Sequence, residues 1–407
     1  MKKSYYDKYG ELINPWYVNH LKKMGIFNIG VKAEGALITD SEGNEYLDCT
    51  SGYGIANLGH NNPQIVRALI EQLSSTEVNS KPFVNKIQVE LAELFKEITP
   101  GELECSVLVN SGSEAVETAI KLVRLYKGEK RIISMEGSFH GLTMGSLSAS
   151  GVESFKRSYK PLLPAFEQVP FGDFGMLENK VDDNTAAVLL EPVQHDAGVK
   201  IPSEEYLHKV RKLCTENNII LVFDEVITGM GKTGFMFASE FFKVEPDILI
   251  IGKSLGAGLV PIGAVIARKN LWQRFGMSFP MTATSYGGNS LACRAAIESI
   301  NFIRSNNLLD SVKEKSKLLS KGLNKIADDF PDIIRSISGL GILFGMEISD
   351  KKIAETVVRQ MAENRILVYQ SFGNPFVIMI EPPLIISVQQ IEKVVEAFNL
   401  VLNEISI

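Results

Sequence analysis

Two side chains with complementary chemistry follow apolar stretches in the middle of the chain. Residues 219–223 (IILVF) run directly into Asp224, and residues 248–251 (ILII) are followed by Gly252 and Lys253. Ligands of an open parallel sheet bind outside the carboxyl ends of its strands, so both side chains are candidates for one site. Taken singly, Asp224 could equally cap a turn, and a lone lysine is usually a solvated surface charge.

The pair matches the needs of pyridoxal chemistry. A lysine amine forms the Schiff base, and an acid group keeps the pyridine nitrogen protonated so that the ring accepts electrons. Residues 110–124 (NSGSEAVETAIKLVR) add a glycine turn and a helix expected to open at Ser113, where free backbone N–H groups and the helix dipole would hold an anion. Phe139, in SFHG, could stack on a flat ring, although a buried aromatic is the commoner use of such a residue.

Other sequence patterns do not indicate a nucleotide or metal site. The segment GMGKTG (229–234) contains GKT, but the phosphate loop of nucleotide-binding proteins requires a glycine where Val226 stands. The histidines show no metal-binding spacing, and we expect His60 and His140 to hold loops together. The cysteines contain no CxxC pair and are interpreted as buried thiols; they are Cys49, Cys105, Cys214 and Cys293.

Composition limits the classes of protein to consider. Of the 407 residues, 45% are hydrophobic and 22% charged, which is ordinary for a globular protein and excludes a disordered or coiled-coil chain. The net charge of −6 and the absence of a Lys/Arg cluster argue against a nucleic-acid partner. No apolar run reaches the roughly 18 residues that a membrane span needs, and the N-terminus lacks the apolar core of a signal peptide. We therefore expect a cytoplasmic protein with no membrane association.

The elements that must position these residues alternate along the chain. We expect helices over 63–73, 87–98, 113–127 and 204–216, and strands over 106–109, 131–134, 186–190, 219–223, 248–251 and 262–267. Apolar strands separated by helices predict an α/β fold with a mostly parallel sheet covered on both faces. Beyond about residue 300 we expect one amphipathic helix over 300–329, strands over 342–348 and 376–380, and a last helix opened by a capping box of Ser387 and Gln390.

The pattern of expected helices and strands changes near residues 60 and 300, which suggests three segments. Residues 61–300 would form a large domain that binds the cofactor, and residues 301–407 a smaller C-terminal domain. Residues 1–60, with short strands expected over 36–39 and 45–49, would pack with the small domain.

Together these segments resemble the class III, fold type I pyridoxal-phosphate-dependent aminotransferases, and most closely their putrescine aminotransferase branch. The resemblance covers nearly the whole chain, in the family's order and spacing. Besides 110–124 and FHG, it is carried by EYLDCTSGYGIANLGHNNP (45–63), PLLPAFEQVPFGD (161–173), EPVQ (191–194), LVFDEVITGMGKTG (221–234), DILIIGKSLGAGLVPIGA (247–264), TSYGGN (284–289) and EPPL (381–384).

The resemblance implies a role for each matching residue. Lys253 matches the lysine that binds pyridoxal 5′-phosphate and moves the proton, Asp224 the partner of its pyridine nitrogen, and Phe139 and Val226 the groups on either side of the ring. The remaining cofactor contacts would be Ser111, Gly112, Ser113, His140, Glu191 and Thr284. Ser285 stands where the family has a threonine that reaches the phosphate from the other subunit, which implies a homodimer with shared active sites. The implied substrate pocket contains Tyr53, His195, Asp196 and Met379.

Three departures from the family pattern concern the substrate. Members that handle α-amino acids carry an arginine three residues before PPL, which binds the α-carboxylate; here that residue is Met379. The glutamate that holds this arginine in the family's QGEGG run is Asp196 here, with His195 beside it. A glutamine that often contacts the cofactor is replaced by Ile227. A buried acid left without its arginine would be unpaired, so the first two changes belong together.

We therefore expect an aminotransferase that works by a ping-pong cycle between an oxo acid and an amine or aldehyde without an α-carboxylate at the reacting end. Another arginine, or backbone groups, could bind the carboxylate instead. Two other functions stay open on the sequence: an epimerase or aminomutase of the same fold, which would use the same cofactor residues, and a non-catalytic binding protein, against which the intact Lys253 argues.

Overall fold

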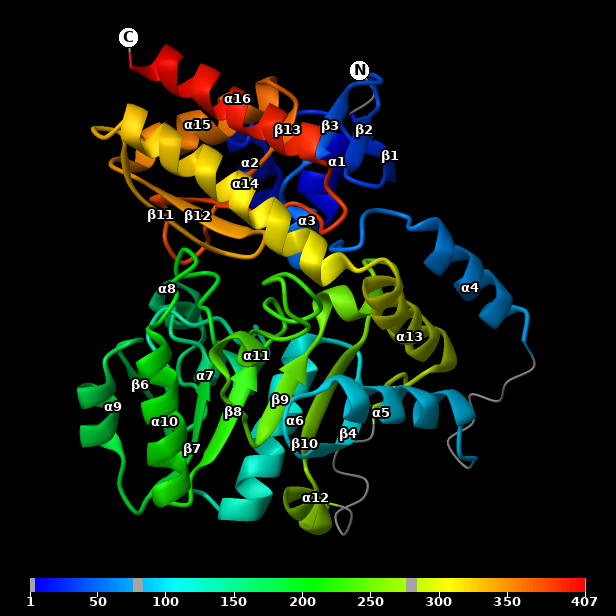
Figure 1. The fold of residues 1–407 in the computed structure, drawn as a ribbon, viewed down its shortest axis with the longest axis vertical. Helices are drawn as coiled ribbons and strands as arrows, with labels where there is room; N and C mark the ends of the chain where they lie inside the picture. The colour runs from blue at the N-terminus through cyan, green and yellow to red at the C-terminus, as the bar shows by residue number, and fades with distance from the viewer. Residues whose placement is uncertain (1–3, 76–82, 276–283, 407) are drawn as a thin grey trace.

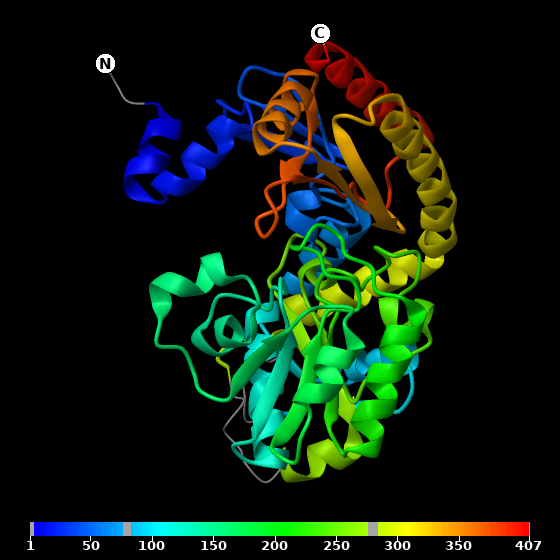
Figure 2. The ribbon, with the colours of Figure 1, turned by 90° about the vertical axis from the view of Figure 1, so that its left-hand side faces the viewer.

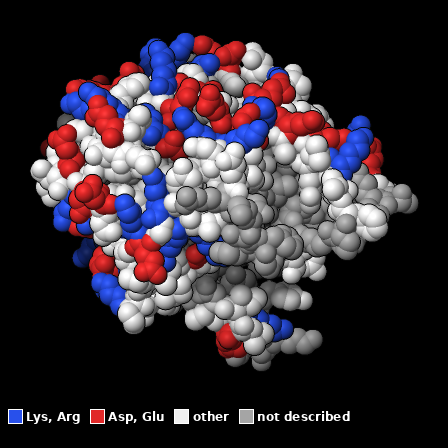
Figure 3. Space-filling model, turned by 90° about the horizontal axis from the view of Figure 1, so that it is seen from below, with Lys and Arg blue, Asp and Glu red and all other residues white. Residues whose placement is uncertain are grey.

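The computed structural model describes residues 4–75, 83–275 and 284–406. Figure 1 shows a large lower part built around one sheet and a smaller upper part that contains both chain termini. Within the described ranges, no helix combines the length and the apolar character needed to cross a bilayer. Basic and acidic side chains are interspersed on the described part of the face shown in Figure 3.

The large part is organised by a seven-stranded sheet in the order β4-β10-β9-β8-β7-β5-β6. Neighbouring strands from β9 to β6 are parallel, whereas β10 runs antiparallel to both β4 and β9. The strands are β4 (Leu103–Val109), β5 (Arg131–Met135), β6 (Phe166–Val169), β7 (Thr185–Leu190), β8 (Ile220–Asp224), β9 (Ile248–Ile251) and β10 (Gly263–Arg268). This is the mostly parallel α/β sheet that the sequence predicts.

Both faces of this sheet are buried, because alternate residues of a strand point to opposite sides. In β8, Leu221 and Phe223 join the core on one side, and Val222 joins the core on the other. Helix α6 (Gly112–Lys127) covers the second side, and α10 (Glu204–Glu216) covers the first, as the side view in Figure 2 also shows. The other helices of this part are α4 (Pro63–Leu73), α5 (Lys86–Ile98), α7 (Met144–Ala149), α8 (Glu153–Lys156), α9 (Phe174–Lys180), α11 (Ala238–Phe242), α12 (Lys269–Phe275) and α13 (Ser290–Ser305).

The smaller part combines the two ends of the chain. Strands β1 (Gly30–Glu34), β2 (Leu37–Asp40) and β3 (Glu45–Asp48) form a sheet with β13 (Ile366–Leu367), which pairs in parallel with β3. A second sheet has the order β11-β12-β15-β14, with β11 (Ile334–Leu340), β12 (Leu343–Ile348), β14 (Tyr369–Gln370) and β15 (Val377–Ile380). The helices of the smaller part are α1 (Tyr5–Leu12), α2 (Pro15–Lys23), α3 (Ser51–Gly54), α14 (Leu308–Asp329), α15 (Lys351–Glu363) and α16 (Val388–Ile405). The division of the chain at residues 60 and 300 stays a prediction.

One expected element is wrong. The helix predicted over 300–329 is two helices, because α13 ends at Ser305 and α14 begins at Leu308. Asn307 has a φ of 48°, in the left-handed region that asparagine tolerates better than most residues. Amphipathic spacing on both sides concealed this break. Helices α4 and α10 and strand β9 have the predicted bounds, and the capping box of Ser387 and Gln390 opens α16.

Candidate active site

The site lies where the strands of the large sheet end. Asp224 is the last residue of β8, and it pairs with Ile250 of the parallel strand β9, after which Lys253 follows. A cavity of about 120 Å³ opens beside them. It is lined by Ser111, Gly112, Ser113, Phe139, His140, Gly141, Glu191, Asp196, Asp224, Val226, Ile227 and Lys253. Five segments that are distant in the sequence thus meet at the edge predicted from the strand ends.

Asp224 is held in place by two hydrogen bonds. Its Oδ2 lies 2.8 Å from Nδ1 of His140, and its Oδ1 accepts a hydrogen bond of 3.1 Å from the backbone N–H of Val226. The side chains of Asp224 and His140 are buried, and Nε2 of His140 has no hydrogen-bond partner among the described residues. The imidazole therefore fixes the direction of the carboxylate that faces the cavity.

Glu191 joins two other walls of the cavity. Its Oε1 accepts a hydrogen bond of 3.0 Å from the N–H of Phe139, and its Oε2 one of 3.3 Å from the N–H of His195. Burial raises the pKa of the Glu191 carboxyl to about 7, although the nearby His140 opposes the rise. Glu191 consequently positions the aromatic wall relative to the segment that carries Asp196.

The turn before α6 is built for close approach to a ligand. Ser111 caps the helix by accepting a hydrogen bond of 3.1 Å from the N–H of Glu114. Gly112 and Ser113 follow in the first turn, where N–H groups have no partner within the helix. Gly141 faces this turn with a φ of 118°, and a Cβ atom there would lie 2.8 Å from Cβ of Ser113. The glycines keep the backbone groups accessible.

These features fit pyridoxal phosphate. The cavity offers a primary amine on Lys253, a carboxylate whose direction His140 fixes, and apolar walls from Phe139 and Val226. The helix start supplies backbone N–H groups and the positive end of a dipole for the phosphate. Lys253 has a φ of 43°, so its backbone is held in the left-handed region.

Of the predicted substrate residues, Asp196 lines the cavity, whereas Tyr53, His195 and Met379 are not among the residues that line it. The ring of Tyr53 meets the ring of Tyr369 edge-on, with centroids 4.8 Å apart. His195 Nδ1 lies 3.6 Å from Oδ2 of Asp196. Met379 is fully buried in β15, paired with Gly345 on one side and Tyr369 on the other.

Two predicted cofactor residues do not line this cavity. Thr284 accepts a hydrogen bond of 2.8 Å from Nδ2 of Asn110, next to the turn before α6, and Ser285 is exposed. Ser285 is accessible to a second chain because it is exposed, and its expected role across a dimer stays a prediction.

Two buried polar groups beside His195 were not predicted from the sequence. Glu381 is fully buried, its Oε1 lies 3.3 Å from His195 Nε2, and it accepts a hydrogen bond of 2.5 Å from Tyr369. Lys232, from the GKT segment, is also fully buried and donates hydrogen bonds of 3.3 Å to the carbonyl oxygens of Glu381 and Pro382. The signal available for Glu381 was a single carboxylate at the end of the apolar run VIMIEPP.

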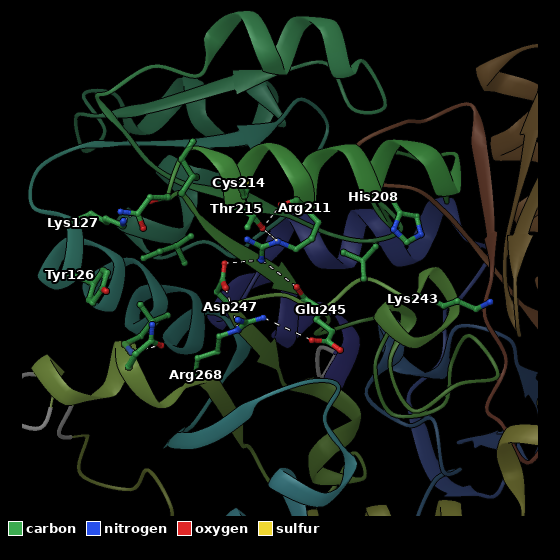
Figure 4. Close-up of a pocket in the computed structure, with 16 residues that line it drawn as sticks. Tyr126, Lys127, His208, Arg211, Cys214, Thr215, Lys243, Glu245, Asp247 and Arg268 are labelled. Carbon is green, nitrogen blue, oxygen red and sulfur yellow. Dashed lines mark hydrogen bonds and ion pairs between the residues drawn. The ribbon is translucent and has the colours of Figure 1, made fainter.

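A larger pocket of about 540 Å³ lies elsewhere, at the amino ends of β8 and β9 (Figure 4). Its arginines are already paired: Arg211 and Arg268 lie 2.8 and 3.3 Å from the carboxylate of Asp247. Because Lys253 and Asp224 belong to the opposite ends of the same strands, this pocket is separate from the candidate active site.

The comparisons with known proteins agree with this geometry. The aminotransferase class-III family matches residues 18–402. A transaminase from the marine bacterium Virgibacillus is 26% identical, with a TM-score of 0.93 over 99% of each chain. Ornithine aminotransferase from Toxoplasma gondii is 29% identical, with a TM-score of 0.87 over 93% of this chain and 91% of that one. An (S)-enantioselective omega-transaminase from Thermomicrobium roseum is 26% identical, with a TM-score of 0.88 over 95% of each chain. The chain therefore belongs to the class III aminotransferases and is a pyridoxal-phosphate-dependent transaminase of fold type I.

Proposed function

We propose that this transaminase takes its amino group from an amine without an α-carboxylate at the reacting carbon, a diamine or another terminal amine as in the putrescine branch, and passes it to an oxo acid. The cycle is ping-pong: the oxo product of the donor leaves before the acceptor binds. The same site would work in reverse on the corresponding aldehyde.

The observation that carries the proposal is the charge of the substrate side. Met379 occupies the position of the family's carboxylate-binding arginine, and its side chain is enclosed in the core. The only lysine or arginine among the residues that line the cavity is Lys253, and the cavity is also lined by the acidic residue Asp196. Among the residues that line the cavity, the α-carboxylate of a donor would therefore find no guanidinium partner.

Each cavity residue has a task in this reaction. Bound pyridoxal phosphate supplies an electron sink for the negative charge that develops at the reacting carbon. Asp224, directed by His140, would hold the protonated pyridine nitrogen, and Phe139 and Val226 would flank the ring. The N–H groups of Gly112 and Ser113 would bind the phosphate.

Lys253 would carry the proton. Its amine would hold the cofactor, and in the free form Nζ would accept a proton from one carbon of the substrate–cofactor pair and return it to another. Its backbone has a φ of 43°, and its side chain lines the cavity. Among the residues that line the cavity, no other acid or base stands at the position of this amine, so the proton shift depends on Lys253.

We also propose a homodimer in which Ser285 contributes to the phosphate site of the partner subunit. The support is that Ser285 is exposed in a single chain. Mixing a Lys253→Ala variant with a Ser285→Tyr variant tests this. Shared sites predict that mixed dimers regain one intact site, and an active Ser285→Tyr enzyme would contradict the proposal.

The donor class is tested with the purified holoenzyme, pyruvate or 2-oxoglutarate as acceptor, and a panel of amines and α-amino acids. The proposal predicts higher kcat/KM for amines such as 1,4-diaminobutane than for alanine or glutamate. A strict preference for α-amino acids on both sides would refute it.

A further inference from the structure

The wall of the cavity next to Lys253 is apolar. Ile227 lines the cavity together with this lysine, and its residue is only 8% exposed. A Cβ atom placed on Gly54 would lie 3.2 Å from Cδ1 of Ile227 and 3.7 Å from Cδ of Lys253. The isoleucine side chain and the hydrocarbon stem of the lysine therefore border the same position of the chain.

The groups that fit pyridoxal phosphate also fix which way its ring would face. Asp224 would hold the pyridine nitrogen, Lys253 would bond the aldehyde carbon at the opposite end of the ring, and the start of α6 would bind the phosphate arm. In pyridoxal phosphate, the phosphate arm and the phenolic oxygen flank the aldehyde carbon on opposite sides. The phenolic oxygen would then lie beside Lys253, on the side away from the start of α6.

Few side chains can donate a hydrogen bond to an oxygen placed there. Among the described residues that line the cavity, the side chains with donor groups are Ser111, Ser113, His140 and Lys253. The two serines belong to the start of α6, where the phosphate would bind. Nδ1 of His140 lies 2.8 Å from the carboxylate of Asp224, at the other end of the ring. Of these donors, Nζ of Lys253 is the one beside the phenolic oxygen.

The other charged groups around the lysine are acids or are already bound. Glu191 accepts hydrogen bonds from backbone N–H groups on both of its oxygens. Asp196 lies 3.6 Å from Nδ1 of His195. Outside the residues that line the cavity, the amine of Lys232 lies 4.0 Å from the carboxylate of Glu381 and donates to backbone carbonyl oxygens. These groups do not replace the missing donor at the apolar wall.

An apolar wall changes how readily Nζ gives up its proton when the cofactor is bound. With the proton in place, the negatively charged phenolic oxygen accepts a hydrogen bond from Nζ and lies against its positive charge. When the proton leaves, this oxygen keeps its charge but has no side-chain donor beside the hydrocarbon of Ile227. A charged oxygen without a hydrogen-bond partner is unfavourable in apolar surroundings, so loss of the proton is opposed.

We infer that Ile227 controls the protonation of the bound cofactor: its apolar side chain keeps the proton on Nζ of Lys253 to higher pH than a hydrogen-bond donor at this position would. A protonated nitrogen makes the attached carbon more reactive toward a neutral amine. Alkyl ammonium groups such as that of lysine have an ordinary pKa of about 10.4, so alkyl amines become neutral only at raised pH. The retained proton therefore favours donors of the proposed class. This consequence rests on the proposed function, whereas the proton retention requires only that Lys253 bonds the cofactor.

An absorbance titration of the holoenzyme tests the inference without any donor. The absorption band of the lysine-bound cofactor shifts when Nζ loses its proton, so the midpoint of the titration reports how firmly the proton is held. Ile227→Gln places an amide donor at the wall. We expect it to lower the midpoint by about one to two pH units, because a hydrogen bond to a charged group changes an equilibrium about 10- to 100-fold. Ile227→Leu keeps the wall apolar and should keep the wild-type midpoint.

Three further variants complete the experiment. Ile227→Thr keeps the branched shape and adds one hydroxyl donor, so a smaller decrease of the midpoint is expected. Ile55→Gln is the matched control: it makes the same change beside Gly54, but Ile55 is 42% exposed and is not among the residues that line the cavity. Its midpoint should equal that of the wild type. Lys253→Ala should show no such titration, because the nitrogen that carries the proton is removed.

The outcomes separate this inference from the proposed function. If Ile227→Gln and Ile227→Thr both keep the wild-type midpoint, or if Ile55→Gln lowers it as much as Ile227→Gln does, the inference is wrong. A titration that persists in Lys253→Ala would refute both the inference and the role proposed for that lysine. If the midpoint falls in Ile227→Gln but the wild type accepts only α-amino acids, the inference stands and the proposed donor class is wrong.

Discussion

Gly141→Ala is a sharp test of how the cofactor cavity is closed. Gly141 lies opposite the turn before α6 (residues 111–113). Its φ of 118° is one that residues with a Cβ atom rarely adopt. A Cβ atom there would overlap Oγ of Ser113 and lie 2.8 Å from Cβ of Ser113 and from Oγ of Ser146. The substitution therefore strains the backbone and displaces the serine that we propose as a phosphate contact.

The two contributions can be separated. The backbone conformation costs about 1–2 kcal/mol for an L-residue, and the overlap adds about 1–3 kcal/mol. Gly172 has a φ of 86°, and a Cβ atom added there would have no other atom within 4 Å, so Gly172→Ala carries only the backbone cost. We expect Gly141→Ala to lose about 2–5 kcal/mol of unfolding free energy and Gly172→Ala about 1–2 kcal/mol.

Urea unfolding of both variants, and titration of their apo forms with pyridoxal phosphate followed by absorbance, measure these effects. The phosphate site predicts that Gly141→Ala binds the cofactor at least about tenfold more weakly, which corresponds to about 1.4 kcal/mol. Gly172→Ala should bind it normally. If both variants lost the same stability and Gly141→Ala kept its affinity for pyridoxal phosphate, the close contact between Gly141 and Ser113 would not be what closes the phosphate site.

Three other expectations follow from the same structure. Asp224→Asn should keep the fold and lower kcat by about 100-fold or more, because it removes the charge that we propose to hold the pyridine nitrogen; an active variant in steady-state assays would contradict this role. Burial opposes protonation of His195, but Glu381 and Asp196 raise its pKa to about 9. The stability that protonated His195 contributes is therefore present below its ordinary pKa of 6.5 and is lost as the pH rises through about 9, so unfolding free energy should fall more steeply between pH 6.5 and 9.5 in the wild type than in His195→Gln. Leu221→Ala, in the buried middle of β8, should lower the unfolding free energy by about 2–5 kcal/mol in denaturant titrations, and a loss below about 1 kcal/mol would show that the strand is not close-packed there.

The cofactor residues could be predicted because they follow local patterns. Asp224 and Lys253 each end an apolar stretch, and parallel strands bring such ends to one edge of the sheet. The turn at Gly112 opens a helix, and the glycine at 141 is close to it in space although not in sequence. The comparisons confirm the family and the cofactor, while the individual roles of these residues and the position of the domain boundaries stay predictions.

The substrate side could be predicted only in part. Met379 stands out in the sequence because an arginine is expected at its place, and the strand expected over 376–380 contains it, but its neighbours Gly345 and Tyr369 on the adjacent strands have no local signal. Lys232 belongs to a GKT segment that fails as a phosphate loop, yet it lies fully buried against the carbonyl oxygens of Glu381 and Pro382. The break at Asn307 is hidden because helical spacing continues on both sides of it.

By itself, the sequence determined the class of fold, the family and the cofactor, because strand, turn and helix signals are local and their order along this chain is specific. The tertiary structure alone decided which polar groups from distant parts of the chain contact each other. His195 and Glu381 are 186 positions apart, and neither sequence segment indicates that they meet at 3.3 Å. Burial and the charge of neighbouring groups set the ionisation of a side chain, and both depend on contacts between distant segments that form only when the chain folds.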